Sequence, residues 1–160
     1  MTFAYWCVLV AAFLPIVWAG AAKFGKPGFD NARPREFLAA LDGWPARANW
    51  AQANSYEAFP PFAAGVIIAH ATGNADQGTI DLLAGIFIAA RIAYGLLYIA
   101  DRASLRSFVW LAGFGAIVLL TAWLPMVLKE LPLSLPIFCV AVGALLAGLF
   151  DQAQAPSPQA

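Results

Sequence analysis

Two charged residues lie inside segments of the chain that are otherwise apolar enough to cross a membrane. Glu57 falls within residues 46–72, and Arg91 falls within residues 78–100. A charge in lipid costs free energy, so such residues usually face the interior of a protein and mark a functional site. We therefore take Glu57 and Arg91 as the first candidates for chemistry.

Further polar and aromatic side chains share a helix face with each of these charges, because positions three or four apart lie on one face. On the second segment this face carries Arg47, Trp50, Asn54, Glu57 and Pro61. On the third segment it carries Arg91, Tyr94 and Tyr98, and the following turn adds Arg102. The sequence thus predicts one polar pocket between helices, near the end where the basic residues gather.

The long apolar segments supply the helices that this pocket requires. Of the 160 residues, 62% are hydrophobic and 11% are charged, whereas soluble domains average about half and about a quarter. A helical span needs about 20 apolar residues. We predict an all-α integral membrane four-helix bundle with spans at about 3–22, 46–72, 78–100 and 105–128.

The remaining segments of the chain lie between or after these four spans. Residues 131–150 are long enough for a fifth span, which we favour, and a surface-lying or re-entrant segment is the alternative. Residues 1–150 then form a single transmembrane domain, and the tail at 151–160, rich in Pro, Gln and Ala, is predicted to be disordered. In the first loop we expect a short helix over 35–41, ended by Gly43 and Pro45.

The basic residues indicate the orientation in the membrane, since cytoplasmic loops carry an excess of Lys and Arg. The first loop and its edge hold Lys23, Lys26, Arg33, Arg35 and Arg47. The third loop holds Arg102 and Arg106, and the second holds no Lys or Arg. We expect an inner (cell) membrane protein with its N-terminus outside, and with loops one and three and the polar pocket facing the cytoplasm.

Composition and motifs argue against several other classes of protein. The formal net charge is zero, so no basic field for nucleic acid exists. Cys7 and Cys139 lack metal-ligand spacing, and we interpret them as buried small apolar residues. No metal site, phosphate loop or nucleophile elbow is predicted. His70 is interpreted as a helix-packing residue, and Gly113 and Gly115 as positions of close packing.

Two stretches resemble a known family of membrane proteins. The run from Asn54 to Pro60, Asn-Ser-Tyr-Glu-Ala-Phe-Pro, is similar to the Asn-x-x-Glu-x-x-Pro signature of the MAPEG superfamily, the membrane proteins of eicosanoid and glutathione metabolism. The second stretch resembles the junction of the third and fourth spans in the microsomal prostaglandin E synthase group. It comprises Arg91, Tyr94, Tyr98, Arg102, Arg106 and Ser107.

The resemblance implies a homotrimer of four-helix subunits that binds glutathione as its cofactor and acts on lipophilic small molecules. It implies transferase or peroxidase activity, with the glutathione site between subunits. By the same resemblance, Arg106 stabilises the thiolate and Ser107 helps to activate the thiol. The resemblance carries glutathione-binding roles over to Asn54, Glu57 and Tyr98. The predicted polar pocket adds Arg47, Arg91, Tyr94 and Arg102 as residues expected to bind it.

Departures from the family pattern leave a second hypothesis open. Trp50 and Ala53 stand where members that bind glutathione well carry arginines, and Tyr94 stands where the prostaglandin synthase has His. Each lost charge-assisted contact removes roughly 1.5–3 kcal/mol, so the chain could be a non-catalytic scaffold or lipid-binding member.

Each candidate residue also has a structural interpretation. Glu57 would pair with Arg91 or Arg47 to hold helices together. Arg102 and Arg106 would be basic anchors, and Tyr94 and Tyr98 interfacial aromatics. A transporter is disfavoured, because the chain shows no inverted repeat.

Overall fold

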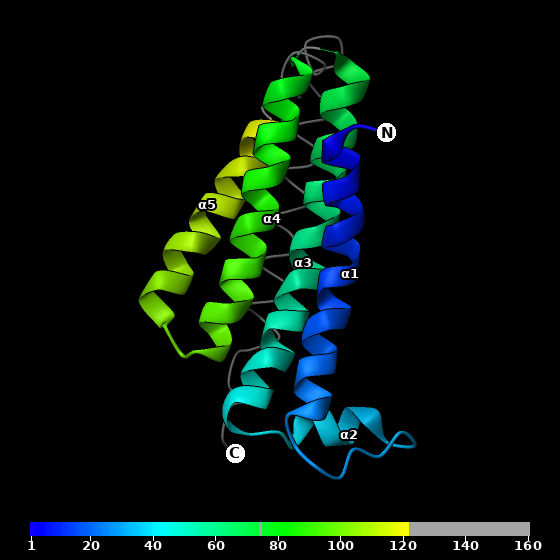
Figure 1. Cartoon of the computed structure of the whole chain (residues 1–160), viewed down its shortest axis with the longest axis vertical. Helices are drawn as coiled ribbons and strands as arrows, with labels where there is room; N and C mark the ends of the chain where they lie inside the picture. Colours follow the sequence, from blue (N-terminus) through cyan, green and yellow to red (C-terminus); the bar gives the residue numbers. More distant parts are fainter. Residues whose placement is uncertain (74, 122–160) are drawn as a thin grey trace, which may run out of the picture. The chain divides into compact units, whose positions relative to one another are not determined.

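The computed structural model describes residues 1–73 and 75–121, and every regular element within them is a helix (Figure 1). The helices are α1 (Phe3–Phe24), α2 (Pro34–Ala39), α3 (Gly43–Thr72), α4 (Gln77–Ile99) and α5 (Ala103–Thr121). The chain divides into two compact units, Met1–Leu124 and Pro125–Ala160, and all described residues belong to the first. The predicted segment 131–150, the tail at 151–160 and the end of the predicted fourth span lie outside the described residues.

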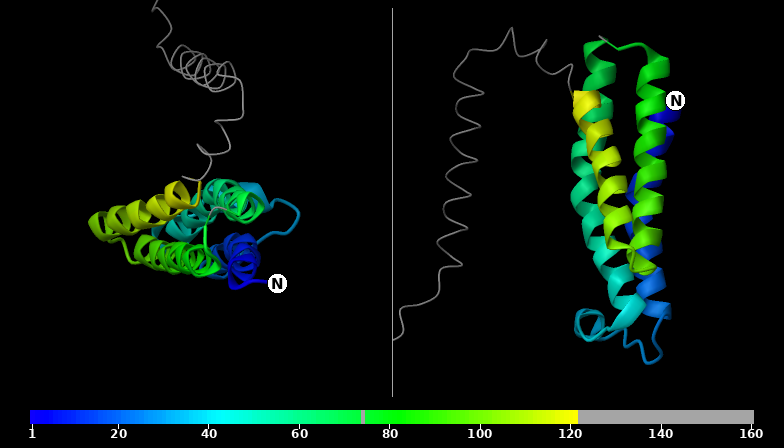
Figure 2. Two further views of the ribbon diagram at one scale, coloured as in Figure 1. Left: turned by 90° about the horizontal axis from the view of Figure 1, so that it is seen from above. Right: turned by 90° about the vertical axis from the view of Figure 1, so that its left-hand side faces the viewer.

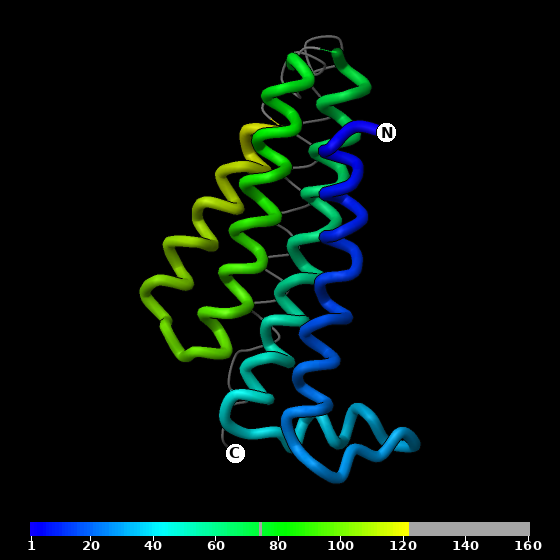
Figure 3. The backbone as a smooth tube through the Cα atoms, viewed as in Figure 1, coloured from blue at the N-terminus to red at the C-terminus, as the bar shows by residue number. Residues whose placement is uncertain are grey.

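The four long helices run side by side with alternating direction (Figures 1 and 2). The central pair is α3 and α4, and each of these contacts both α1 and α5. The end of α1, the start of α3, the end of α4 and the start of α5 therefore meet at one end of the unit, as the tube in Figure 3 also shows. The two loops in which the sequence concentrates Lys and Arg lie at this end, which we call the basic end.

Three of the helices, α1, α4 and α5, are long and apolar enough to cross a membrane. The fourth predicted span forms the helix α3, but α3 does not meet the same criterion. The reason is its polar first half, which carries Arg47, Asn49, Gln52, Asn54 and Glu57. The helix predicted over 46–72 is thus confirmed, while its crossing of a membrane stays a prediction.

The first loop contains the short helix that the sequence predicts, but its end differs from the expectation. The helix α2 begins at Pro34 and already stops at Ala39. Gly43 and Pro45, expected to end it, instead form the first turn of α3. Proline suits a first helical turn because the N–H groups there have no partner within the helix.

Two apolar clusters hold the long helices together. In the larger one, the rings of Phe62 on α3 and Phe87 on α4 stack with centroids 3.8 Å apart. In the smaller one, the indole of Trp18 packs against Gly95, and its neighbours are Leu14 and Ala51. The small residues Gly95 and Ala51 let the helices approach closely here, as is usual for helices that pack in membranes.

Large apolar side chains also cover the outer faces of the described unit. On α1 the exposed ones are Phe3, Trp6, Leu9, Val10, Phe13, Ile16 and Val17. On α5 they include Leu105, Phe108, Leu111, Phe114, Val118 and Leu119. Apolar surfaces of this extent are not left in water. Together with the three span-like helices, they indicate an integral membrane protein in a lipid bilayer.

Polar contacts close the end of the unit opposite the basic end. The Val66 carbonyl can only accept, so the Nδ1 of His70 donates to it. The Nε2 of the same neutral imidazole then accepts from the Thr2 hydroxyl, 3.2 Å away. The imidazole also stacks on Tyr5 at 4.5 Å, which confirms the interpretation of His70 as a helix-packing residue. Asp81 of α4 accepts from the backbone N–H of Ala4 at 2.8 Å and so satisfies the first turn of α1.

The N-cap of α4 is Asp76, whose carboxylate accepts from the Thr79 hydroxyl and backbone N–H. These hydrogen bonds favour the charged form and hold the pKa of the Asp76 carboxyl below its ordinary value. A capping aspartate of this kind fixes where the helix begins. The start of α4 is thus determined locally, and this sets the register of Arg91 further along the helix.

Gly95 tests the close contact between α1 and α4. A Cβ atom at position 95 would overlap the six-membered ring of Trp18, which is itself buried. We expect Gly95→Ala to lower the free energy of unfolding by about 1–3 kcal/mol through overpacking. The measurement is thermal or denaturant unfolding of the detergent-solubilised protein.

Gly115→Ala is the matched control, because a Cβ at position 115 meets no atom of residues 1–73 and 75–121 within 4 Å. Alanine has the higher helix propensity, so this variant should be as stable as the parent or more so. Equal stability of the two alanine variants would show that Trp18 does not pack against Gly95.

Candidate functional site

The guanidinium group of Arg91 lies almost fully buried between α4 and α3, with 4% of the residue exposed. Its Nη2 donates to Asn54 Oδ1 at 2.9 Å and to Ser55 Oγ at 3.4 Å. Ser55 in turn donates its own hydroxyl proton to the Ala51 carbonyl at 2.7 Å, so its oxygen is free to accept from Arg91. Two residues of α3 therefore satisfy one edge of the guanidinium.

Asn54 connects the buried cation to Glu57. Its Nδ2 donates to Glu57 Oε2 at 3.1 Å while its Oδ1 accepts from Arg91. Because Arg91 can only donate and an ionised Glu57 can only accept, the two neighbours fix the orientation of the amide. The structural alternative for Glu57, beside its expected role in binding glutathione, was a direct pair with Arg91 or Arg47. In the described part of the chain, the connection to Arg91 instead runs through Asn54, and Glu57 stays exposed.

Two tyrosines of α4 carry the site from Arg91 toward the basic end. The guanidinium of Arg91 lies over the ring of Tyr94 at 4.5 Å, and that of Arg106 lies over the ring of Tyr98 at 4.0 Å. The two rings meet edge to face with centroids 5.5 Å apart. Each cation faces the negative side of an aromatic ring, so this pair of rings holds two positive charges close together.

Among the described residues, three predicted site residues form no hydrogen bond or ion pair with this cluster. Arg47 donates from Nε to the Ile99 carbonyl at 3.1 Å, and its Nη1 lies 3.8 Å from Asp101 Oδ2. It thus caps the C-terminus of α4, where a cation is favourable. Arg102 is exposed. Ser107 is also exposed, and its hydroxyl donates to the Ala103 carbonyl of its own helix at 3.2 Å.

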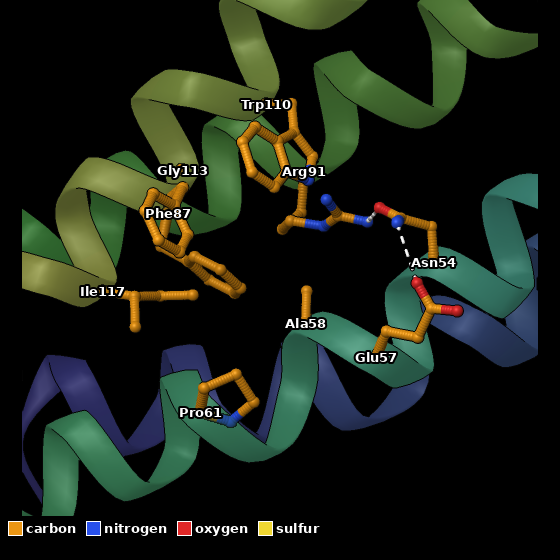
Figure 4. Close-up of a pocket in the computed structure, with 10 residues that line it drawn as sticks. Asn54, Glu57, Ala58, Pro61, Phe87, Arg91, Trp110, Gly113 and Ile117 are labelled. Atoms are coloured by element: carbon orange, nitrogen blue, oxygen red, sulfur yellow. Dashed lines mark hydrogen bonds between the residues drawn. The ribbon is translucent and has the colours of Figure 1, made fainter. Parts of the chain in front are cut away.

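A crevice of about 230 Å³ opens beside Arg91, between α3, α4 and α5 (Figure 4). The residues that line it are Asn54, Glu57, Ala58, Pro61, Phe87, Arg91, Trp110, Gly113, Phe114 and Ile117. Its charged and amide groups come from Asn54, Glu57 and Arg91, and the rest of the wall consists of apolar side chains and the indole of Trp110. Pockets that bind small molecules commonly combine an apolar wall with a few converging polar groups.

Sequence reasoning missed the contribution of the apolar face of α5 to the crevice and the role of Ser55. Trp110, Gly113, Phe114 and Ile117 stand at helical spacing on one face of α5, and this spacing was the available signal. Gly113 is a position of close packing as expected, because a Cβ there would lie 3.4 Å from that of Ala90. Gly115 is not such a position among the described residues, since none of them lies within 4 Å of where its Cβ would be.

Comparison with known proteins gives one informative result. Neither the curated proteins nor the solved structures include a match to this chain. The family model described as the MAPEG family matches residues 3–125, a range that contains all five described helices and every residue of the cluster and the crevice. Because this match covers most of the chain, the chain belongs to the MAPEG family.

Proposed function

We propose that this MAPEG-family protein is a glutathione-dependent membrane enzyme acting on lipophilic small molecules. It would join the glutathione thiol to an electrophile, or oxidise two such thiols to a disulfide while reducing a lipid hydroperoxide to an alcohol and water. One observation carries the proposal, namely the arrangement of two arginines on a tyrosine pair beside an Asn–Glu pair. Its members are Asn54, Glu57, Arg91, Tyr94, Tyr98 and Arg106.

The charges of this cluster suit glutathione. Two guanidinium groups and the carboxylate of Glu57 leave an excess of one positive charge, because Arg47 is already paired with Asp101. Glutathione carries two carboxylates and one ammonium group, so its net charge is opposite. Glu57 would accept from the ammonium group, and Arg91 would donate to a carboxylate. Charge-assisted hydrogen bonds of this kind contribute about 1.5–3 kcal/mol each.

Arg106 is positioned to activate the thiol. A thiol becomes nucleophilic when it loses its proton, and a nearby guanidinium lowers the thiol pKa by stabilising the thiolate. The ring of Tyr98 holds the Arg106 guanidinium in place at 4.0 Å. Ser107 would donate to the sulfur only after giving up its hydrogen bond to Ala103.

The proposed setting is the family's homotrimer of four-helix bundles in the inner membrane. The basic end would face the cytoplasm, where glutathione is dissolved, with the N-terminus outside. The apolar outer faces of α1 and α5 support contacts with neighbouring subunits or with lipid. Lipophilic substrates would then reach the crevice from the bilayer, and glutathione from the aqueous side.

A second candidate is a non-catalytic scaffold or lipid-binding member that has lost the glutathione site. The observation that favours it is Trp50, which is 53% exposed and lies against Tyr98 with ring centroids 6.1 Å apart. An indole thus occupies a position where glutathione-binding relatives carry a guanidinium. Ala53, the second such position, is exposed and brings no charge.

Glutathione binding decides between these two candidates. We expect calorimetry on the detergent-solubilised protein to show binding in the millimolar range or tighter. Glu57→Gln should abolish most of the heat, since the ammonium group loses its anionic partner, and Ala53→Arg should tighten binding. Glu36→Gln, a charge change in the exposed helix α2, is the control and should bind like the parent. No heat from the parent at several millimolar glutathione would favour the scaffold.

Arg106 can be tested through the pH dependence of turnover. Arg106→Ala should lower kcat/KM for a glutathione conjugation roughly a hundred-fold and move the rise of the rate to higher pH. The direction follows because the thiol loses the cation that lowers its pKa. Arg35→Ala, on an exposed residue of the first loop, should change neither quantity. An Arg106→Ala enzyme with parental rates and an unchanged pH profile would exclude Arg106 as the thiolate partner.

A further inference from the structure

The turn between α4 and α5 holds a residue with an unusual backbone conformation (Figure 1). Asp101 has φ 59°, and it is the only residue other than glycine with a positive φ within residues 1–73 and 75–121. Its N–H donates to the Tyr98 carbonyl at 3.1 Å, and the N–H of Arg102 donates to the Leu97 carbonyl at 2.9 Å. These two hydrogen bonds form the Schellman motif, in which glycine usually takes the left-handed position. Asp101 thus stands where the fold favours glycine.

The charge of Asp101 is also unfavourable for folding at this position. The C-terminal end of a helix carries a partial negative charge, which repels a carboxylate. The Asp101 Oδ2 lies 3.8 Å from Arg47 Nη1, but 73% of the Asp101 side chain is exposed. An ion pair that water reaches to this extent contributes little to stability. Because backbone strain without a gain in stability often serves function, Asp101 is a candidate for a functional role.

Arg47 is the residue that Asp101 holds. It is the only Arg or Lys of α3, and it shares one helix face with Asn54 and Glu57. Its Nε donates to the Ile99 carbonyl at 3.1 Å, whereas its Nη1 is the atom beside Asp101. The Nε bond anchors the guanidinium, so Nη1 can change its partner while the anchor is kept. With 23% of its side chain exposed, Arg47 can be reached by a dissolved anion.

The spacing along α3 fits a ligand that carries two carboxylates. Arg47 precedes Asn54 by seven residues, which is two helical turns or about 10 Å. In the proposed function, the end of glutathione that carries the ammonium group lies at Glu57 and Arg91. An extended tripeptide spans about 10 Å, so the glycine carboxylate at its other end comes within reach of Arg47.

We propose that Asp101 is a positioning residue that keeps Arg47 ready for a ligand carboxylate. In the free protein the Asp101 carboxylate takes the place of that anion, and on binding the glycine carboxylate of glutathione replaces it at Nη1. Asp101 therefore keeps a largely buried arginine paired when no ligand is bound, and the ligand must displace it. This inference rests on the proposed glutathione-dependent function and adds to it the group that competes for the second carboxylate site.

Calorimetry with glutathione and with its glycine monoethyl ester tests the exchange on the intact chain in detergent. Asp101→Asn removes the competing charge, while asparagine still tolerates the left-handed conformation. Glutathione should therefore bind roughly two- to five-fold more tightly. The ester lacks the glycine carboxylate, so its affinity should stay unchanged. The control Asp42→Asn, which frees Lys26 at the same end of the unit, should bind both compounds like the parent.

Arg47→Gln separates the exchange from a general effect of charge. In this background Asp101→Asn should leave the affinity for glutathione unchanged, because the cation for which the two carboxylates compete is gone. A gain that persists without Arg47, or an equal gain for the ester, would overturn the proposal.

Unfolding measurements give a readout that distinguishes this role from a purely structural one. Asp101→Gly removes both the strain and the charge, so it should raise the midpoint of thermal unfolding by about 2–4 °C. Asp101→Asn should raise the midpoint less. A lower midpoint for Asp101→Gly would show that Asp101 stabilises the fold, and this would contradict a residue retained for the ligand.

Chemical modification separates a failure of this proposal from a failure of the proposed function. Phenylglyoxal adds to arginine side chains, and mass spectrometry follows its reaction with Arg47. The absence of glutathione binding in every variant would refute the proposed function. Protection of Arg47 by succinate in Asp101→Asn, and not in the parent, would then still support an anion site that Asp101 occupies. No protection in either protein would refute that site as well.

Discussion

The hydrogen bond from Arg91 to Asn54 joins α4 to α3 at a depth where the arginine is almost fully buried. An unpaired charge at such a place costs several kcal/mol, and the cost falls only when hydrogen bonds replace those of water. The carbonyl oxygen of Asn54, the hydroxyl of Ser55 and the face of Tyr94 supply this replacement. The relative register of the two central helices is therefore tied to one guanidinium group.

The functional cluster follows from that register. Once Arg91 is fixed against α3, Tyr94 and Tyr98 follow on the next turns of α4, and Tyr98 receives Arg106 from the start of α5. The small residues Ala90 and Gly113 let α5 approach α4, which places Trp110 across the crevice from Pro61 and Ala58. One polar contact and one close helix contact together position a cationic cluster beside an apolar wall.

The length of the apolar segments and the helical spacing of the polar residues were sufficient to predict the helices and the faces that carry the cluster. The helical spacing of Asn54 with Glu57 and of Arg91 with Tyr94 placed each pair on one face, and the structure brings the two faces together. The spacing could not show that Arg47 turns away to cap α4, because its partners, Ile99 and Asp101, are far along the chain.

The contribution of α5 to the apolar wall of the crevice escaped prediction for a different reason. An apolar stripe with Trp110 and Phe114 has the same pattern whether it faces lipid, a helix or a crevice. Only the packing of α5 against α4 distinguishes these cases.

A double-mutant cycle between Arg91 and Asn54 tests the central claim most directly, with unfolding measured in mixed micelles. We predict that Asn54→Leu alone destabilises the protein by about 1–3 kcal/mol or more, because it leaves the buried guanidinium without its closest acceptor. In the Arg91→Met background the same change should cost far less, so the two effects are not additive. Additive effects would mean that Arg91 and Asn54 stabilise the protein independently, and would contradict a site organised around their hydrogen bond.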